Sequence, residues 1–137
     1  MNIAFARTKY RKANNPASVE VQSSHEIIQT TLRELERSLE VLSAAQSAGN
    51  AFPSDHINRS FTAIYSLQSS LDFEKGGDLA VRLFQLYEYC RLQTLRAFKR
   101  EENCELSQAH EAISGILSAW TDIAGDVDQG KGKPDKE

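Results

Sequence analysis

The sequence predicts an all-α protein, folded as an antiparallel four-helix up-down bundle. Four segments of roughly 20 residues each carry apolar residues in steps of three and four, the spacing of an amphipathic helix. Six of the seven glycines and all three prolines lie between or outside these segments, where they would end helices. No segment alternates between apolar and polar residues as a half-buried strand would. Because the chain has 137 residues, close to the roughly 150 of an average domain, we expect one domain.

The first predicted helix begins at Ser23 and ends in the run SAGNAFPSD. Ser23 and Glu26 have the spacing of a capping box, in which the serine accepts a bond from a free backbone N–H and the glutamate reaches back to the cap. One face of this helix is the predicted core side. It carries Ile28, Leu32, Leu35, Leu39 and Leu42.

The second and fourth predicted helices each have one apolar face. The second begins near Ser54 or Asp55, both good N-caps, and ends at Gly76 and Gly77. Its face consists of Ile57, Phe61, Ile64 and Leu71, with Tyr65 and Leu67 beside it. The fourth is expected over about 105–124. Its face consists of Leu106, Ala109, Ile113, Ile116, Trp120 and Ile123.

The third predicted helix, over about 78–102, has two apolar stripes. The predicted core stripe consists of Leu79, Leu83, Leu86, Cys90 and Ala97. A second stripe, centred about 110° away, consists of Ala80, Phe84, Tyr87, Leu95 and Phe98. Together they cover about half the helix, whereas a bundle helix needs an apolar stripe only somewhat over about 100° wide. Two interpretations are open: the helix is embedded between two neighbours, or the second stripe forms a groove for a partner helix.

The bundle is expected over residues 23–124, between an N-terminal arm and a C-terminal tail. Residues 1–22 form the predicted arm and residues 125–137 the predicted disordered tail, because neither has a sustained apolar stripe. We expect the arm to be mobile or loosely docked. Tyr10 in the arm is either a disordered aromatic residue or an anchor that folds back onto the bundle.

The charges are unevenly distributed along the chain. The net charge is −3, but residues 1–12 contribute +4 and residues 126–137 contribute −1, which leaves −6 on residues 13–125. An acidic body argues against nucleic-acid binding, which needs clustered Lys and Arg. The basic arm is interpreted as a solvated tail, with contact to nucleic acid or an acidic membrane as the alternative. We therefore expect no nucleic-acid partner.

The sequence offers no residues on which to base an enzyme. It contains no Glu-x-x-His spacing of the kind that binds iron in helical bundles, and no two of its three histidines share a helical face. It has no phosphate loop, dinucleotide fingerprint or G-x-S-x-G pattern. Cys90 is expected to be a small buried apolar residue, and Cys104 an incidental thiol. We expect no catalytic residue, no metal and no cofactor.

Two features predict a cytoplasmic protein. Two cysteines are too few for a disulfide framework of the kind found in secreted proteins. The chain has no apolar run close to the roughly 18 residues that span a bilayer, and its first residues lack the apolar region of a signal peptide. We therefore expect no membrane insertion.

The most specific pattern is the run SSLDFEKGGDLA at 69–80, followed by LFQLYEY at 83–89. It resembles the signature L-D-x-E-K-G-G-[DE]-[IL]-A with L-x-x-L-Y-[ED]-Y of the flagellar secretion chaperone family FliS. The resemblance covers about residues 20–124 and includes Trp120, near the end of the last helix, where the family also tends to place a tryptophan. Tyr10 lies where the family usually has a tyrosine in its N-terminal segment.

The resemblance implies a cytoplasmic chaperone that binds the disordered C-terminal region of newly made flagellin before type III export and prevents premature polymerisation. It implies that this region folds partly into helices in apolar grooves, part of which the N-terminal arm can occupy when flagellin is absent. The residues expected to bind the partner are Tyr10, Leu67, Leu71, Phe73, Ala80, Phe84, Tyr87, Leu95 and Phe98.

One departure from the family concerns the first helix. Where the family commonly has S-P-E-x-L followed by M-L-Y-D-G, this chain has SHEII at 24–28 and TLREL at 31–35. The alternative interpretation is therefore a divergent regulatory protein of the same fold. Such a protein would bind a different export client, a regulator of flagellar gene expression or a component of the export apparatus.

Overall fold

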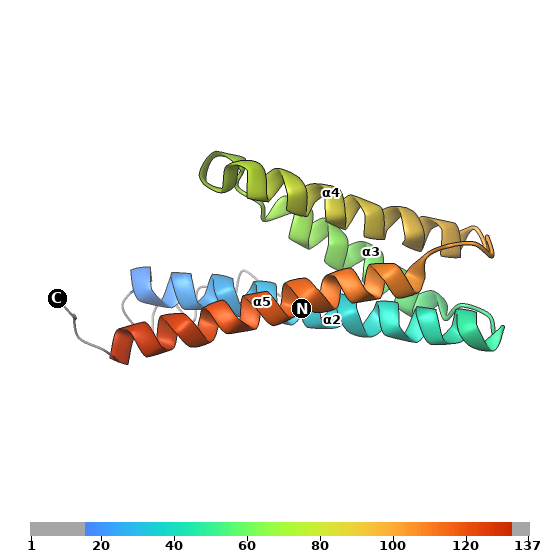
Figure 1. The fold of residues 1–137 in the computed structure, drawn as a ribbon, viewed down its shortest axis with the longest axis horizontal. Coiled ribbons are helices and arrows are strands. Elements are labelled where there is room, and N and C mark those ends of the chain that lie inside the picture. The colour runs from blue at the N-terminus through green and yellow to red at the C-terminus, as the bar shows by residue number, and fades with distance from the viewer. Residues whose placement is uncertain (1–15, 133–137) are drawn as a thin grey trace.

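The structure, a computed structural model, describes the backbone of residues 16–132 and the side chains of residues 24–123. Over that range the chain forms four helices and no strand (Figure 1). They are α2 (Pro16–Ala48), α3 (Ser54–Ser69), α4 (Phe73–Phe98) and α5 (Leu106–Gly132). The predicted all-α fold is confirmed, while Tyr10 and the docking of the arm lie outside the described residues. None of these four helices is long and apolar enough to cross a membrane.

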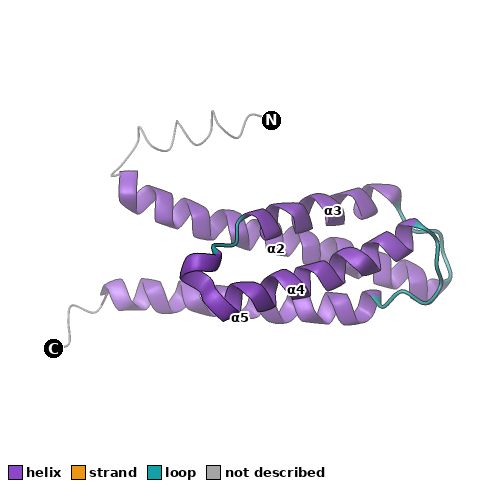
Figure 2. Cartoon of the chain, turned by 90° about the horizontal axis from the view of Figure 1, so that it is seen from above, coloured by secondary structure: helices purple, strands orange, loops and turns teal. Residues whose placement is uncertain are grey.

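Successive helices run in opposite directions and pack against one another as a bundle. α2 lies against both α3 and α5, whereas α4 lies mainly against α3 and makes a much smaller contact with α5. Figure 1 shows α3 and α4 diverging from α2 and α5 toward the turn at 70–72, which we call the open end. The connections 49–53 and 99–105 lie together at the opposite, closed end (Figure 2).

The centre of the core is the predicted apolar face of α2. Four leucines of this face have no exposed surface, since α2 has a neighbouring helix on each side. Full burial of such a side chain stabilises the fold by roughly 1.5–3 kcal/mol. The four are Leu32, Leu35, Leu39 and Leu42, and they pack with Ile64 and Leu67 of α3 and Leu106 and Ile113 of α5.

The core side of α4 is smaller and more polar than that of α2. Cys90 and Thr94 are fully buried, and the Thr94 hydroxyl donates to the Cys90 carbonyl at 2.9 Å. Gln93 is also buried, and its Oε1 accepts from the Glu105 backbone N–H at 2.7 Å, next to the start of α5. Each of these side chains hydrogen-bonds to a backbone group, and none of their polar atoms is left buried without a partner.

Trp120 of α5 joins that helix to α2 at a distance from the connecting loops. Its ring stacks on His25 with centroids 4.5 Å apart and planes at 16°, and its Nε1 donates to the His25 carbonyl at 3.1 Å. The stack and the hydrogen bond hold Trp120 of α5 against His25 of α2.

At the closed end, α2 stops in a Schellman motif centred on Gly49. Gly49 has φ 72°, a left-handed conformation that a glycine adopts without steric cost. The Asn50 N–H donates to the Ala45 carbonyl at 2.9 Å and the Gly49 N–H to the Gln46 carbonyl at 3.1 Å. The Gln46 side chain then donates to the Cys104 carbonyl at 2.8 Å, which ties the end of α2 to the connection before α5.

α4 stops beside it in the same motif, but with an arginine at the left-handed position. Arg100 has φ 62°, and the N–H groups of Glu101 and Arg100 donate to the Arg96 and Ala97 carbonyls, both at 2.9 Å. A non-glycine residue in this conformation stores strain of about 1–2 kcal/mol. Two equivalent helix ends thus meet at the closed end, one relaxed and one strained.

Two helix starts differ from the prediction. α2 begins at Pro16, so residues 16–22, assigned from the sequence to the arm, are helical, and Ser23 lies within the helix and not at its cap. Proline suits the first helical position because it lacks an N–H group that would be unsatisfied there. The N-cap of α3 is Pro53, so Ser54 and Asp55 lie in the first turn, where the acidic Asp55 favourably meets the helix dipole.

α5 is longer than predicted, because it runs to Gly132 and not to about Ala124. Residues 125–132, assigned from the sequence to a disordered tail, are therefore helical. The segment after Leu106 has no proline before Pro134, so nothing sterically blocks continuation of the helix.

Candidate functional site

The turn between α3 and α4 is built by Asp72, upstream of the two glycines. Asp72 has an extended backbone with φ −113° and ψ 101°. Its Oδ1 accepts hydrogen bonds from the N–H groups of Glu74 and Lys75, both at 3.0 Å, which makes it the N-cap of α4. α3 therefore ends at Ser69 and not at Gly76 and Gly77 as predicted, and α4 begins at Phe73, before the two glycines.

The two glycines instead bend the beginning of α4. Gly77 has φ 51° and ψ −128°, a conformation that L side chains rarely adopt, and the helix is kinked there. A Cβ added at Gly76 would lie 2.8 Å from the Ala80 Cβ, which is too close for two carbon atoms. The pair of glycines therefore sets the direction of the first turn of α4 relative to the rest of the helix.

That first turn carries Phe73, which forms an aromatic pair with Phe84. The ring centroids are 6.0 Å apart and the planes are tilted by 58°, a favourable geometry for two aromatic rings. Phe73 is 49% exposed and Phe84 is 39% exposed. The capped and kinked turn thus places two aromatic rings together on the surface.

Most of the large apolar side chains exposed among residues 24–123 belong to α4. Val81, Phe84 and Leu92 are exposed and Leu95 is half-buried. At 100° per residue these four lie on one face, roughly 130° from the buried side of the helix. We call them the outer stripe. The exposed apolar residues of α4 are Phe73, Leu79, Val81, Phe84, Leu92 and Phe98.

Glu88 provides a fixed negative charge in the middle of the outer stripe. The Arg91 Nε lies 3.0 and 3.1 Å from the two carboxylate oxygens of Glu88, and Gln68 of α3 donates to Oε1 at 3.1 Å. The hydrogen bonds from Arg91, and then from Gln68, lower the pKa of Glu88 from 4.5 to about 2.

Tyr65 lies on the same face of α3 as Gln68 and is 73% exposed, so it extends this surface.

The structure brings some of the predicted partner residues to the surface and buries others. Phe73, Phe84 and Phe98 are exposed, while Leu71 and Leu95 are half-buried. Tyr10 lies outside the described residues. The prediction that Leu67, Ala80 and Tyr87 lie at the surface is wrong. Their exposed fractions are 1%, 3% and 3%, so they belong to the core.

The error came from assigning the two stripes of α4 by apolar character alone. The buried side of α4 includes the polar residues Gln93 and Thr94. It is therefore rotated from the predicted apolar stripe and also includes Ala80 and Tyr87. Leu79, predicted to be in the core, is 64% exposed because α5 covers little of α4. Val81 and Leu92 were missed, although their angular position beside Phe84 could have identified them.

The buried thiol and phenol of α4 are not reactive groups. Burial raises the pKa of Cys90 to about 12, so this thiol is protonated at neutral pH and is a poor nucleophile. Burial, followed by the nearby Cys90, raises the pKa of Tyr87 to about 12. What this helix offers chemically is an apolar surface with aromatic anchors and the ion pair of Glu88 with Arg91.

Comparisons with known proteins agree on one family. The family model described as FliS, flagellar protein FliS, matches residues 6–127. The flagellar secretion chaperone FliS of Vibrio cholerae is 30% identical over 115 residues, covering 83% of this chain and 85% of the relative. The flagellar secretion chaperone FliSB of Pseudomonas aeruginosa is 26% identical over 120 residues, covering 87% and 95%.

The flagellar secretion chaperone FliS of Salmonella typhimurium is similar over a shorter part. It is 34% identical over 58 residues, which are 42% of this chain and 43% of the relative. No solved structure matches the chain.

Proposed function

The chain belongs to the FliS family of flagellar secretion chaperones, and on that premise we propose that it binds the disordered C-terminal region of newly made flagellin. Binding takes place in the cytoplasm, prevents premature polymerisation of flagellin and supports its type III export. The protein acts by binding alone and carries out no catalysis.

The observation that carries the proposal is the apolar surface that the bundle leaves uncovered along α4. A disordered client pays a large entropic cost when it orders on binding, so it needs an extensive apolar contact in return. The outer stripe and the pair of Phe73 and Phe84 supply such a contact. Their spacing along one helix suits a client helix that lies beside α4 with anchors three, four and seven residues apart.

The test compares two variants that add the same charge at different places. Leu92→Glu puts a carboxylate into the outer stripe, and Gln108→Glu puts one on an exposed position of α5. We expect Leu92→Glu to weaken binding of a flagellin C-terminal segment at least about 10-fold, because a charge buried at an apolar interface is unpaired. Gln108→Glu should bind as the unaltered chain does. Isothermal titration calorimetry gives the affinities.

Calorimetry at several temperatures adds a second criterion. Burial of apolar surface gives a strongly negative heat-capacity change, whereas a charge-driven contact gives a steep dependence on salt. A stable complex with the first signature supports the proposal. If the chain forms no stoichiometric complex with flagellin from its own organism, the regulatory alternative derived from the first helix replaces it.

A further inference from the structure

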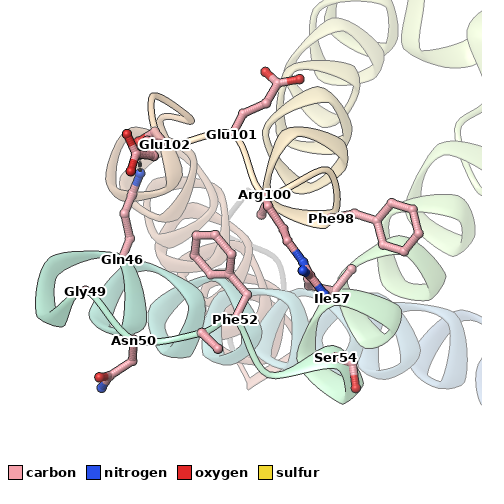
Figure 3. Close-up of a pocket in the computed structure, with 12 residues that line it drawn as sticks. Gln46, Gly49, Asn50, Phe52, Ser54, Ile57, Phe98, Arg100, Glu101 and Glu102 are labelled. Atoms are coloured by element: carbon pink, nitrogen blue, oxygen red, sulfur yellow. Dashed lines mark hydrogen bonds between the residues drawn. The ribbon is translucent and has the colours of Figure 1, made fainter.

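A concave site lies at the closed end, away from the α3–α4 turn. It is a cavity of about 690 Å³ between the connection 49–53 and the end of α4 (Figure 3). This volume falls within the roughly 300–1,000 Å³ of small-ligand sites. Its apolar lining comes from this connection, the first turn of α3 and the end of α4, and consists of Ala51, Phe52, Ile57, Ala97 and Phe98.

Arg100 is the one cation among the residues that line this cavity, which also include Glu101 and Glu102. Figure 3 shows its side chain reaching between Phe52 and Phe98, whereas the side chains of Glu101 and Glu102 point away from it. The ion pairs found among the described side chains join other residues, namely Arg59 with Asp55 and Arg91 with Glu88. The guanidinium is thus available to an anionic group that enters from solvent.

The backbone of Arg100 indicates that its side chain has a use. The equivalent position at the end of α2 is Gly49, which takes the left-handed conformation without strain. Arg100 takes the same conformation with φ 62° and is strained. A glycine would relax the backbone but would remove the only cation among the residues that line the cavity.

We propose that the cavity binds the C-terminal end of a partner polypeptide, with its last aliphatic side chain in the apolar lining and its terminal carboxylate on Arg100. A guanidinium matches a carboxylate with two parallel hydrogen bonds. Asn50 and Ser54 also line the cavity, but Figure 3 shows their side chains pointing away from Arg100, so the apolar lining and the guanidinium are the groups that would hold the occupant. The site is separate from the outer stripe and does not depend on flagellin binding.

The probe is an acetylated peptide Gly-Ser-Gly-Leu-Leu with a free carboxylate, compared with the same peptide amidated at its C-terminus. Titration into the full-length, ¹⁵N-labelled protein, followed by NMR, gives both the affinity and the location. We expect the free acid to bind at least about 10-fold more tightly than the amide, because only the acid can pair with Arg100. The amides that shift should be those of 49–57 and 97–102.

Three variants separate binding from folding. Arg100→Gln should weaken binding of the free acid about 10-fold, and Arg82→Gln, which removes the same charge from an exposed position of α4, should leave it unchanged. Arg100→Gly should lose binding equally while its melting temperature rises, because the backbone strain is relieved. A structural role alone for Arg100 would not give loss of binding together with increased stability.

Several outcomes would overturn the assignment. They are equal affinities for acid and amide, equal weakening by Arg82→Gln and Arg100→Gln, or peptide shifts on the outer stripe instead of the closed end. Decanoate that binds as tightly as the free acid would assign the site to hydrocarbon carboxylates. Leu92→Glu should not affect this peptide, so the result is independent of the flagellin proposal.

Discussion

The leucines of α2 and α4 have the same spacing but opposite environments. On α2, Leu32, Leu35 and Leu39 are fully buried, as their periodicity predicts. On α4, Leu79 is 64% exposed and Leu86 is half-buried, although both lie on a regular apolar stripe. α2 has two neighbouring helices along its length, whereas α4 has mainly one. Periodicity therefore predicts which residues share a face, and the neighbours determine whether that face is buried.

The largest effect is expected in α2. Leu39→Ala should lower the free energy of unfolding by about 2–5 kcal/mol, through lost burial and the cavity left behind. Urea denaturation followed by circular dichroism measures it, with the slope of the transition as a check on two-state behaviour. A loss below about 1 kcal/mol would show that α2 is not the centre of the core.

The kink of α4 should be the next most sensitive place. Gly77→Ala forces a Cβ into a strained conformation with φ 51°, and we expect it to cost about 1–3 kcal/mol. Gly115→Ala in α5 is the matched control, because a Cβ there meets nothing within 4 Å and the helix gains stability of up to about 1 kcal/mol. Equal effects of the two substitutions would contradict the structural role of the kink.

Leu86→Ala tests the comparison between the helices directly. Because Leu86 keeps part of its surface exposed, Leu86→Ala should cost less than Leu39→Ala, about 1–2 kcal/mol. The same denaturation experiment, run beside Leu39→Ala, gives the difference. A loss as large as that of Leu39→Ala would place Leu86 in the core after all.

The smallest effect concerns the charge on the outer stripe. The pKa of Glu88 is lowered from 4.5 to about 2, so its pairing with Arg91 stabilises the fold above about pH 4.5, and this stabilisation is lost as the pH falls toward 2. Since the side chain is 34% exposed, screening limits the contribution to below about 1 kcal/mol. Glu88→Gln should differ from the unaltered chain at pH 7 and converge with it as the pH approaches 2.

Sequence reasoning was reliable where local chemistry determines structure. The four helices and the core face of α2 follow from periodicity, and the N-cap role of Asp72 could have been identified from its place directly before an acidic first turn. Burial on α4 could not be predicted in this way. The core side of that helix depends on Gln93, which pairs with the backbone of Glu105, a contact that appears only after the helices are assembled.

The cavity at the closed end was also beyond sequence reasoning. Its walls come from two connections far apart in the chain, and the left-handed backbone of Arg100 has no signal in residue type, because arginine rarely adopts it. Phe98 was correctly placed on the surface, but its position in this cavity, at the opposite end from Phe73, emerges from the fold.

The divergence of α3 and α4 from α2 and α5 has a consequence for how the bundle opens. Both long connections and the hydrogen bonds of Gln46 and Gln93 hold one end, while the other end lacks close packing between α4 and α5. Thermal fluctuations should therefore separate the two helix pairs from one end, as around a hinge. Backbone amides near Asp78 should exchange with deuterated solvent much faster than those near Thr94, so local unfolding is graded along a single helix.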